Sequence, residues 1–170
     1  MRSIMAMLRP RRADAGTLYE ALVAEARRPG WYLDGGVPDS RDGRFAVLAT
    51  VVAIAILRLE QGGEEAARHS VALTEAFIAD MDAQLRQEGF GDPGIGKQVR
   101  ATVGSLASRV DRWRGTLAGE AEWSDSVASS IYRDEPADEA ARTFAGDSLR
   151  RLSESLGGAG DAEVMAGKWK

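Results

Sequence analysis

The sequence predicts an all-α fold, a single helical bundle of about five to seven helices around a central apolar helix at about residues 42–60. The chain has 170 residues, the size of one ordinary domain. Apolar residues recur at helical spacing in several segments, whereas no segment alternates apolar and polar residues as a half-buried strand does. Residues 45–57 carry no charge, and a helix that is apolar on all sides is normally the surrounded centre of a bundle.

The first half of the chain contains three predicted helices. Residues 17–28 place apolar side chains on one face and end at a Pro-Gly pair, which terminates a helix. The irregular segment 30–45, with four glycines, leads into the central helix. As a helix, the uncharged run covers only about 20 Å of a bilayer core of about 30 Å, so it cannot span a membrane. Residues 64–88 form the third predicted helix, because their apolar side chains share one stripe and a glycine follows as C-cap.

The second half contains three more predicted helices. Asp92 is expected as an N-cap with Pro93 at the first helical position, and the apolar spacing continues to Leu117. A shorter helix is expected over residues 124–132. A last helix is expected from near Pro136 to a glycine pair that begins at residue 157.

The sequence predicts three segments, of which only the middle one is folded. Residues 1–13 form a basic arm, which we interpret as a frayed terminus, with a vestigial targeting segment or a weak anchor for anionic lipid as the alternative. Residues 14–157 form the helical domain. Residues 158–170 are rich in glycine and show no periodicity, so we expect a flexible C-terminal tail, in which Trp169 is unusual.

The composition argues against catalysis. The chain has no cysteine, which excludes disulfides, thiolate metal sites and cysteine nucleophiles. His69 is the only histidine, so multi-histidine metal sites are excluded and acid–base schemes depend on one residue. A net charge of −4 argues against a general nucleic-acid binder. We therefore expect no enzyme activity and no metal site.

Two features suggest binding surfaces. Trp31 and Tyr32 lie in the irregular segment, where such aromatics either plug the end of a bundle or form the centre of a partner site, and the sequence favours neither. Lys97, Arg100 and Arg109 belong to a locally basic side of the helix that begins at residue 92. The ordinary interpretation is a solvated polar face; the functional one is a docking patch for ribosomal RNA or the cytoplasmic leaflet of a membrane.

Two stretches of the chain resemble a known family. They are WYLDGGVPDSRDGRF, which begins at Trp31, and FIADMDAQLRQEGFGDPGIGKQVR, which ends at Arg100. Both resemble signature stretches of the ubiquinol–cytochrome c chaperone family, which assists assembly of cytochrome b into the ubiquinol–cytochrome c reductase. The most specific part is the pattern D-M-x-x-x-L-R-x-x-G-x-G-D-x-x-x-G-K. Its fixed positions here are Asp80, Met81, Leu85, Arg86, Gly89, Gly91, Asp92, Gly96 and Lys97.

The resemblance implies an all-helical chaperone without a cofactor. Mitochondrial members of that family bind newly made cytochrome b close to the ribosomal tunnel exit, together with a small partner protein. The first twelve residues do not form a convincing mitochondrial presequence, so we expect a bacterial, cytoplasmic member. A peripheral position at the cytoplasmic face of the inner membrane, or the matrix side in a eukaryote, is the alternative. We expect contact with the client from Trp31, Tyr32 and Phe90. We expect orientation at the ribosome or at the membrane surface from Lys97, Arg100 and Arg109.

Two alternatives from other functional classes stay open. A helical DNA-binding regulator is disfavoured by the acidic charge and by the lack of a basic recognition helix after a tight turn. An all-α enzyme with a carboxylate-bound metal is disfavoured by the missing histidines.

Overall fold

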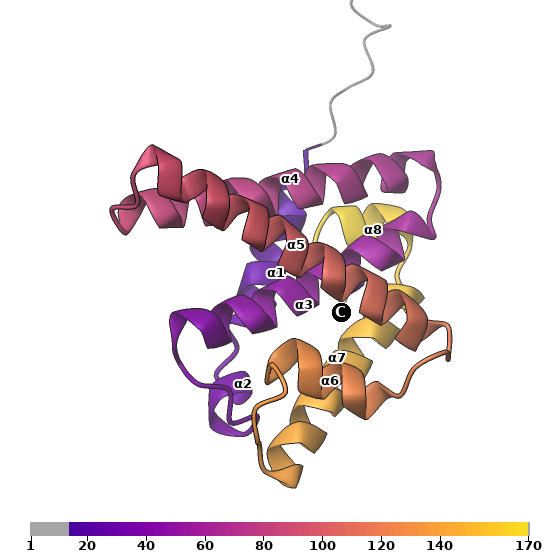
Figure 1. Cartoon of the computed structure of the whole chain (residues 1–170). Coiled ribbons are helices and arrows are strands. Elements are labelled where there is room, and N and C mark those ends of the chain that lie inside the picture. Colours follow the sequence, from indigo (N-terminus) through magenta and orange to yellow (C-terminus); the bar gives the residue numbers. More distant parts are fainter. Residues whose placement is uncertain (1–13, 170) are drawn as a thin grey trace, which may run out of the picture.

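The computed structural model describes residues 14–169, and this part of the chain folds into eight helices and no strand (Figure 1). The helices are α1 (Gly16–Ala26), α2 (Gly30–Leu33), α3 (Arg41–Glu60), α4 (Glu64–Gln87), α5 (Asp92–Leu117), α6 (Trp123–Ile131), α7 (Glu139–Gly158) and α8 (Asp161–Met165). The predicted all-α class is confirmed. The two helices that the sequence did not predict, α2 and α8, have only 4 and 5 residues. The basic arm at residues 1–13 lies outside the described residues.

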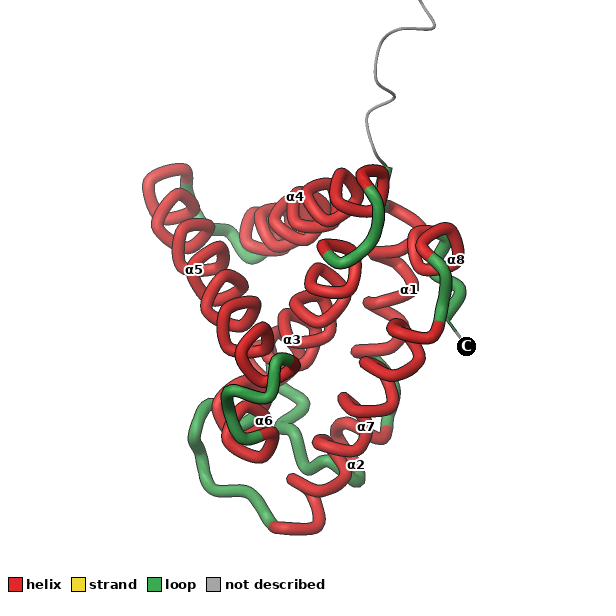
Figure 2. Tube along the Cα trace, turned by 90° about the vertical axis from the view of Figure 1, so that its right-hand side faces the viewer, coloured by secondary structure: helices red, strands yellow, loops and turns green. Residues whose placement is uncertain are grey.

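Helix α3 is the central helix, as its uncharged sequence predicts. Almost every side chain from Ala46 to Leu57 is fully buried. Figures 1 and 2 show α3 in the middle of the molecule, with α4 and α5 toward one side and α7 toward the other. Its first turn is fixed by Ser40, whose hydroxyl accepts a hydrogen bond from the backbone N–H of Gly43 at 3.1 Å.

Helices α4 and α5 form an antiparallel pair that packs on α3. Figure 2 shows the two helices diverging from the turn that joins them, with α3 on the third side. The turn contains Gly89 in the left-handed backbone region, at φ 85°, where a side chain would be strained. Helix α5 begins at Asp92, so its N-cap position is Gly91 and not Asp92 as the sequence suggested. The proline at the first turn is placed as predicted.

The C-terminal tail is packed, which differs from the flexible tail expected from its glycines. Helix α8 contacts α1 and α4, and Val164 and Trp169 are buried in the hydrophobic core. The guanidinium of Arg58 holds the tail from α3, since it donates to the carbonyls of residues 156 and 159 at 2.8 and 2.7 Å and to Asp161 at 2.9 Å. The sequence did not predict this packing, because the side chains that hold the tail are single residues in segments too short to show a helical period.

Candidate binding groove

A groove of about 1250 Å³ opens where the first half of α3 faces the second half of α4 and the first half of α5. The end of α1 and residues 129–134 complete its wall. Several apolar side chains line it, and all of them are buried or half-buried: Val23, Ala26, Phe45, Leu48, Met81 and Leu85. A groove with such a lining can cover apolar surface of a bound polypeptide.

Charged residues surround this apolar lining, and most of them neutralise one another. Three exposed ion pairs span its edges: Arg41–Glu88 at 2.6 Å, Arg44–Asp39 at 2.7 Å and Arg133–Asp42 at 3.0 Å. Exposed pairs of this kind contribute roughly 0–1 kcal/mol each. Their main effect is to balance the charge of the groove edge and to join α3 to its neighbours.

Two groove cations have no ion pair among the described residues: Arg27, which is exposed, and Arg109, which is half-buried. The guanidinium of Arg109 lies at the groove wall between α3, α5 and α6, and donates to Thr50 Oγ1 at 3.3 Å, to the Ser105 carbonyl and Oγ at 3.2 and 2.6 Å, and to the Ser130 carbonyl at 2.8 Å. The ring centre of Phe45 is 5.7 Å from its central carbon. All of these partners are neutral, and among the described residues no carboxylate lies within ion-pair distance of Arg109.

The electrostatic surroundings of Arg109 disfavour its charge. Burial, and to a lesser extent the positive charges of Arg133 and Arg112, lower the pKa of the guanidinium to about 10. The sequence placed Arg109 on a solvated basic face, and this placement is wrong. Helix α5 is covered by both α3 and α6, so a side chain next to its apolar stripe is enclosed as well.

Trp31 and Tyr32 have different surroundings. Trp31 is only 2% exposed and its indole N–H donates to the Glu25 carbonyl at 3.0 Å, so it plugs the end of the bundle, one of the two alternatives left open above. Tyr32 is half-buried, donates its hydroxyl to the Ala26 carbonyl at 2.9 Å and lines the groove. Burial raises the pKa of Tyr32.

The remaining predicted site residues lie outside the groove lining. Phe90 is 37% exposed in the turn between α4 and α5, where the guanidinium carbon of Arg41 is 5.8 Å from its ring centre. Lys97 and Arg100 are exposed on α5. The structure therefore brings together Tyr32 and Arg109, but not the other four residues. The sequence analysis did not identify the apolar groove lining, because its residues belong to the same helical stripes as the core.

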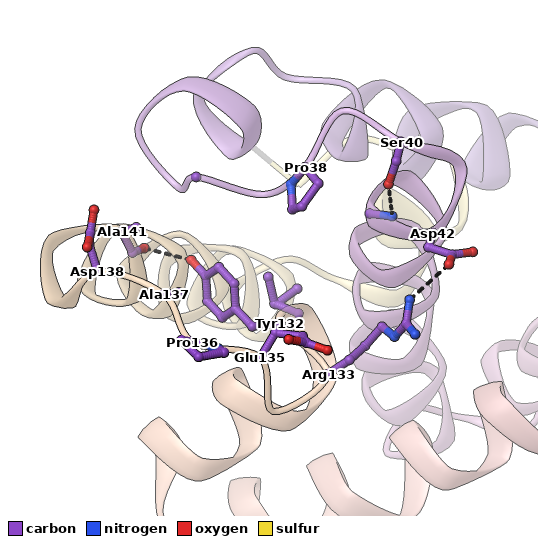
Figure 3. Close-up of a pocket in the computed structure, with 13 residues that line it drawn as sticks. Pro38, Ser40, Asp42, Tyr132, Arg133, Glu135, Pro136, Ala137, Asp138 and Ala141 are labelled. Carbon is purple, nitrogen blue, oxygen red and sulfur yellow. Dashed lines mark hydrogen bonds and ion pairs between the residues drawn. The ribbon is translucent and has the colours of Figure 1, made fainter.

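A smaller cavity, of about 530 Å³, lies between residues 36–43 and residues 131–141 (Figure 3). The buried hydroxyl of Tyr132 lies 2.7 Å from the Gly35 carbonyl and 2.9 Å from the Ala141 carbonyl, and its one hydrogen is donated to either. Arg133 and Asp134 follow with positive φ values of 56° and 61°. This backbone turns Arg133 toward Asp42, so Arg133 borders both the cavity and the groove (Figure 3).

Among the described residues, no group of three or more His, Asp or Glu side chains is arranged to hold a metal ion. None of the helices in residues 14–169 combines the length and the hydrophobicity that crossing a bilayer requires.

Comparisons with known proteins identify the family and the fold. Residues 33–170 match the family model described as ubiquinol–cytochrome C chaperone. The match includes α3, α4 and α5, which form most of the groove, and begins just after Tyr32. A crystal structure of the Cbp3 homolog from Brucella abortus has the same fold, with a TM-score of 0.70 and 23% sequence identity, over 90% of this chain and 85% of that chain. The comparison with curated proteins gave no significant match.

Proposed function

The chain belongs to the ubiquinol–cytochrome c chaperone family, and we propose that it binds newly made cytochrome b and promotes assembly of the ubiquinol–cytochrome c reductase without catalysing a reaction. The observation that carries this proposal is the family match over residues 33–170. The chemistry of the chain agrees with it, because the sequence has one histidine and no cysteine. A chaperone needs complementary surface and no reactive group.

The groove supports the proposal as a place for the client. A membrane protein outside the bilayer exposes apolar side chains to water, and covering them is favourable by about 25 cal/mol per Å². The apolar lining between α3, α4 and α5 offers such cover, and its charged edges stay solvated. We assign client contact to Tyr32 at the groove and to Phe90 beside it. Trp31 supports this contact from the core, where it fixes α2.

The exposed cations of α5 have a separate role in the proposal. Lys97 and Arg100 orient the chaperone at an anionic surface, either the ribosome or the cytoplasmic leaflet of the inner membrane. Charge reversal of both residues should weaken co-sedimentation with ribosomes or with anionic liposomes at low salt. Reversal of Arg142 and Arg151, two exposed arginines of α7, changes the net charge equally and is the matched control. Equal sedimentation of both variants would contradict this role.

The experiment that tests the proposed function is affinity purification of the tagged chain from its native cells in mild detergent, with the co-purifying chains identified by mass spectrometry. We expect enrichment of cytochrome b over a tag-only control, and a lower level of assembled reductase when the gene is deleted. Enrichment of DNA-associated proteins with salt-sensitive DNA binding would instead support a regulator. Stoichiometric metal in the purified chain, without cytochrome b, would support a metal enzyme.

A further inference from the structure

The groove contains one half-buried positive charge that no carboxylate of the described residues balances, whereas Arg27, its other cation without an ion pair, is exposed to solvent. The groove arginines at positions 41, 44 and 133 each have a carboxylate partner, whereas Arg109 has only hydroxyl and carbonyl oxygens around it. A guanidinium has five N–H groups, and the described contacts of Arg109 use four of them. One N–H on Nη2 therefore has no acceptor among the described contacts.

The groups around Arg109 favour an anion as the acceptor of that N–H. The neighbouring charges of Arg133 and Arg112 are positive, and the oxygens in contact with the guanidinium belong to neutral hydroxyl and carbonyl groups, among them the Ser130 carbonyl at the carbonyl end of α6. The carboxylates of Asp42 and Glu88 are already paired at the groove edge. A half-buried charge without a counter-ion is costly, so an incoming carboxylate gains more here than at an exposed arginine.

The lining next to Arg109 sets the character of the molecule that carries this carboxylate. Arg109 and Ser105 line the same groove as Val23, Tyr32 and Phe45, whose half-buried side chains keep part of their surface accessible. A small free anion leaves this apolar surface uncovered. A polypeptide segment with one acidic side chain among apolar ones covers the surface and balances the charge together.

We propose that the groove between α3, α4 and α5 docks an amphipathic segment of the client, and that Arg109 binds a carboxylate side chain of that segment. The inference rests on the proposed function for the identity of the client. It adds the site and the chemical feature of the client that the site recognises.

Peptide binding tests the inference directly. Overlapping 20-residue fluorescent peptides that cover cytochrome b of the same organism serve as probes, measured by fluorescence anisotropy. Each acidic peptide is compared with a counterpart in which Asp becomes Asn and Glu becomes Gln. We expect at least one acidic peptide to bind the wild-type protein about tenfold more tightly than its amide counterpart. Arg109→Gln should remove this preference, so that the acidic peptide and its amide counterpart bind the variant with equal affinity.

Arg109 also joins α5 to α3 and α6, so its replacement affects folding as well as binding. A second variant therefore keeps Arg109 and changes a neighbouring residue. Ser105→Glu places a carboxylate four residues before Arg109 on the same helix, at the spacing of a stabilising pair. The introduced carboxylate should compete with the client and remove the preference for acidic peptides, while Arg109 keeps its contacts to Thr50 and Ser130. Ser108→Glu is the matched control, because Ser108 is exposed on α5 and is not part of the groove lining.

The outcomes separate this inference from the proposed function. If cytochrome b co-purifies with the wild-type chain but acidic and amide peptides bind equally, the role of Arg109 is refuted and the chaperone function stands. The role of Arg109 is also refuted if Ser105→Glu and Ser108→Glu weaken the binding of acidic peptides equally. If cytochrome b does not co-purify, the proposed function fails, and absence of binding by every peptide refutes the groove site as well.

Discussion

Replacing Trp31 with alanine should strongly destabilise the fold, because this side chain belongs to the core and not to a free binding surface. Trp31 is 2% exposed, and its indole N–H donates to the carbonyl of Glu25 at the end of α1. It thereby ties α2 to α1, and α2 in turn holds Tyr32 beside the groove.

The magnitude follows from burial. An indole buries roughly 150–250 Å², which at about 25 cal/mol per Å² corresponds to roughly 4–6 kcal/mol as an upper estimate. Part of this is kept by the alanine methyl group, and the lost hydrogen bond adds about 1 kcal/mol. We therefore expect Trp31→Ala to lower the free energy of unfolding by about 3–5 kcal/mol, in line with other buried Trp→Ala changes. Trp31→Phe keeps most of the packing and should lower it by about 1–2 kcal/mol.

Urea unfolding followed by circular dichroism at 222 nm measures these differences. Leu33→Ala is the matched control, since Leu33 is in the same short helix but 79% exposed, and its effect should stay within about 0.5 kcal/mol. A loss below about 1 kcal/mol for Trp31→Ala, or equal losses for the two variants, would refute the assignment of Trp31 to the core. In that case, direct contact with the client would be the better interpretation of Trp31.

Three further predictions concern the tail and pH. Truncation after residue 160 removes the buried side chain of Trp169 and should lower the free energy of unfolding by about 3–5 kcal/mol in urea; an unchanged midpoint would show that the tail does not stabilise the fold. The N–H of Gly63 and then the guanidinium of Arg58 hold the pKa of Asp161 below its ordinary value, so its contribution is present at neutral pH and lost as the pH falls through that lowered value. Asp161→Asn should accordingly be less stable than wild type at pH 7, and a stability difference that does not shrink in acid would contradict this linkage. Burial raises the pKa of Tyr132 to about 12, so its contribution is lost as the pH rises from about 10 toward that value, and wild type should lose more stability between pH 8 and pH 11 than Tyr132→Phe does. Equal losses of stability in wild type and Tyr132→Phe would show that the Tyr132 hydroxyl is exposed to solvent.

Local signals along the chain are sufficient for most of the helices. The charge-free run within α3, the glycine after α4 and the proline at the start of α5 act through neighbouring residues, so their effects can be predicted without the fold. The same signals missed α2 and α8, which are too short to show a period and are held by contacts with other helices.

The site was predictable only in part. Tyr32 lines the groove, as an aromatic at a partner site does, whereas its neighbour Trp31 is in the core. Adjacent residues with similar chemistry gave the same signal in the sequence, and only the direction of each side chain separates them. The groove lining was not predicted, since Phe45 and Met81 follow the same helical period whether another helix or empty space faces them.

The amino-acid sequence by itself determined an all-α bundle around the helix at residues 41–60, a chain with no cysteine and one histidine, and the motif that carries the family resemblance. Only the tertiary structure decided that Arg109 contacts Thr50, 59 residues away, and that Arg58 anchors the tail at Asp161, 103 residues away. The physical reason is that helix formation depends on residues within a few turns, whereas burial and charge balance depend on helices that meet only after the chain has folded.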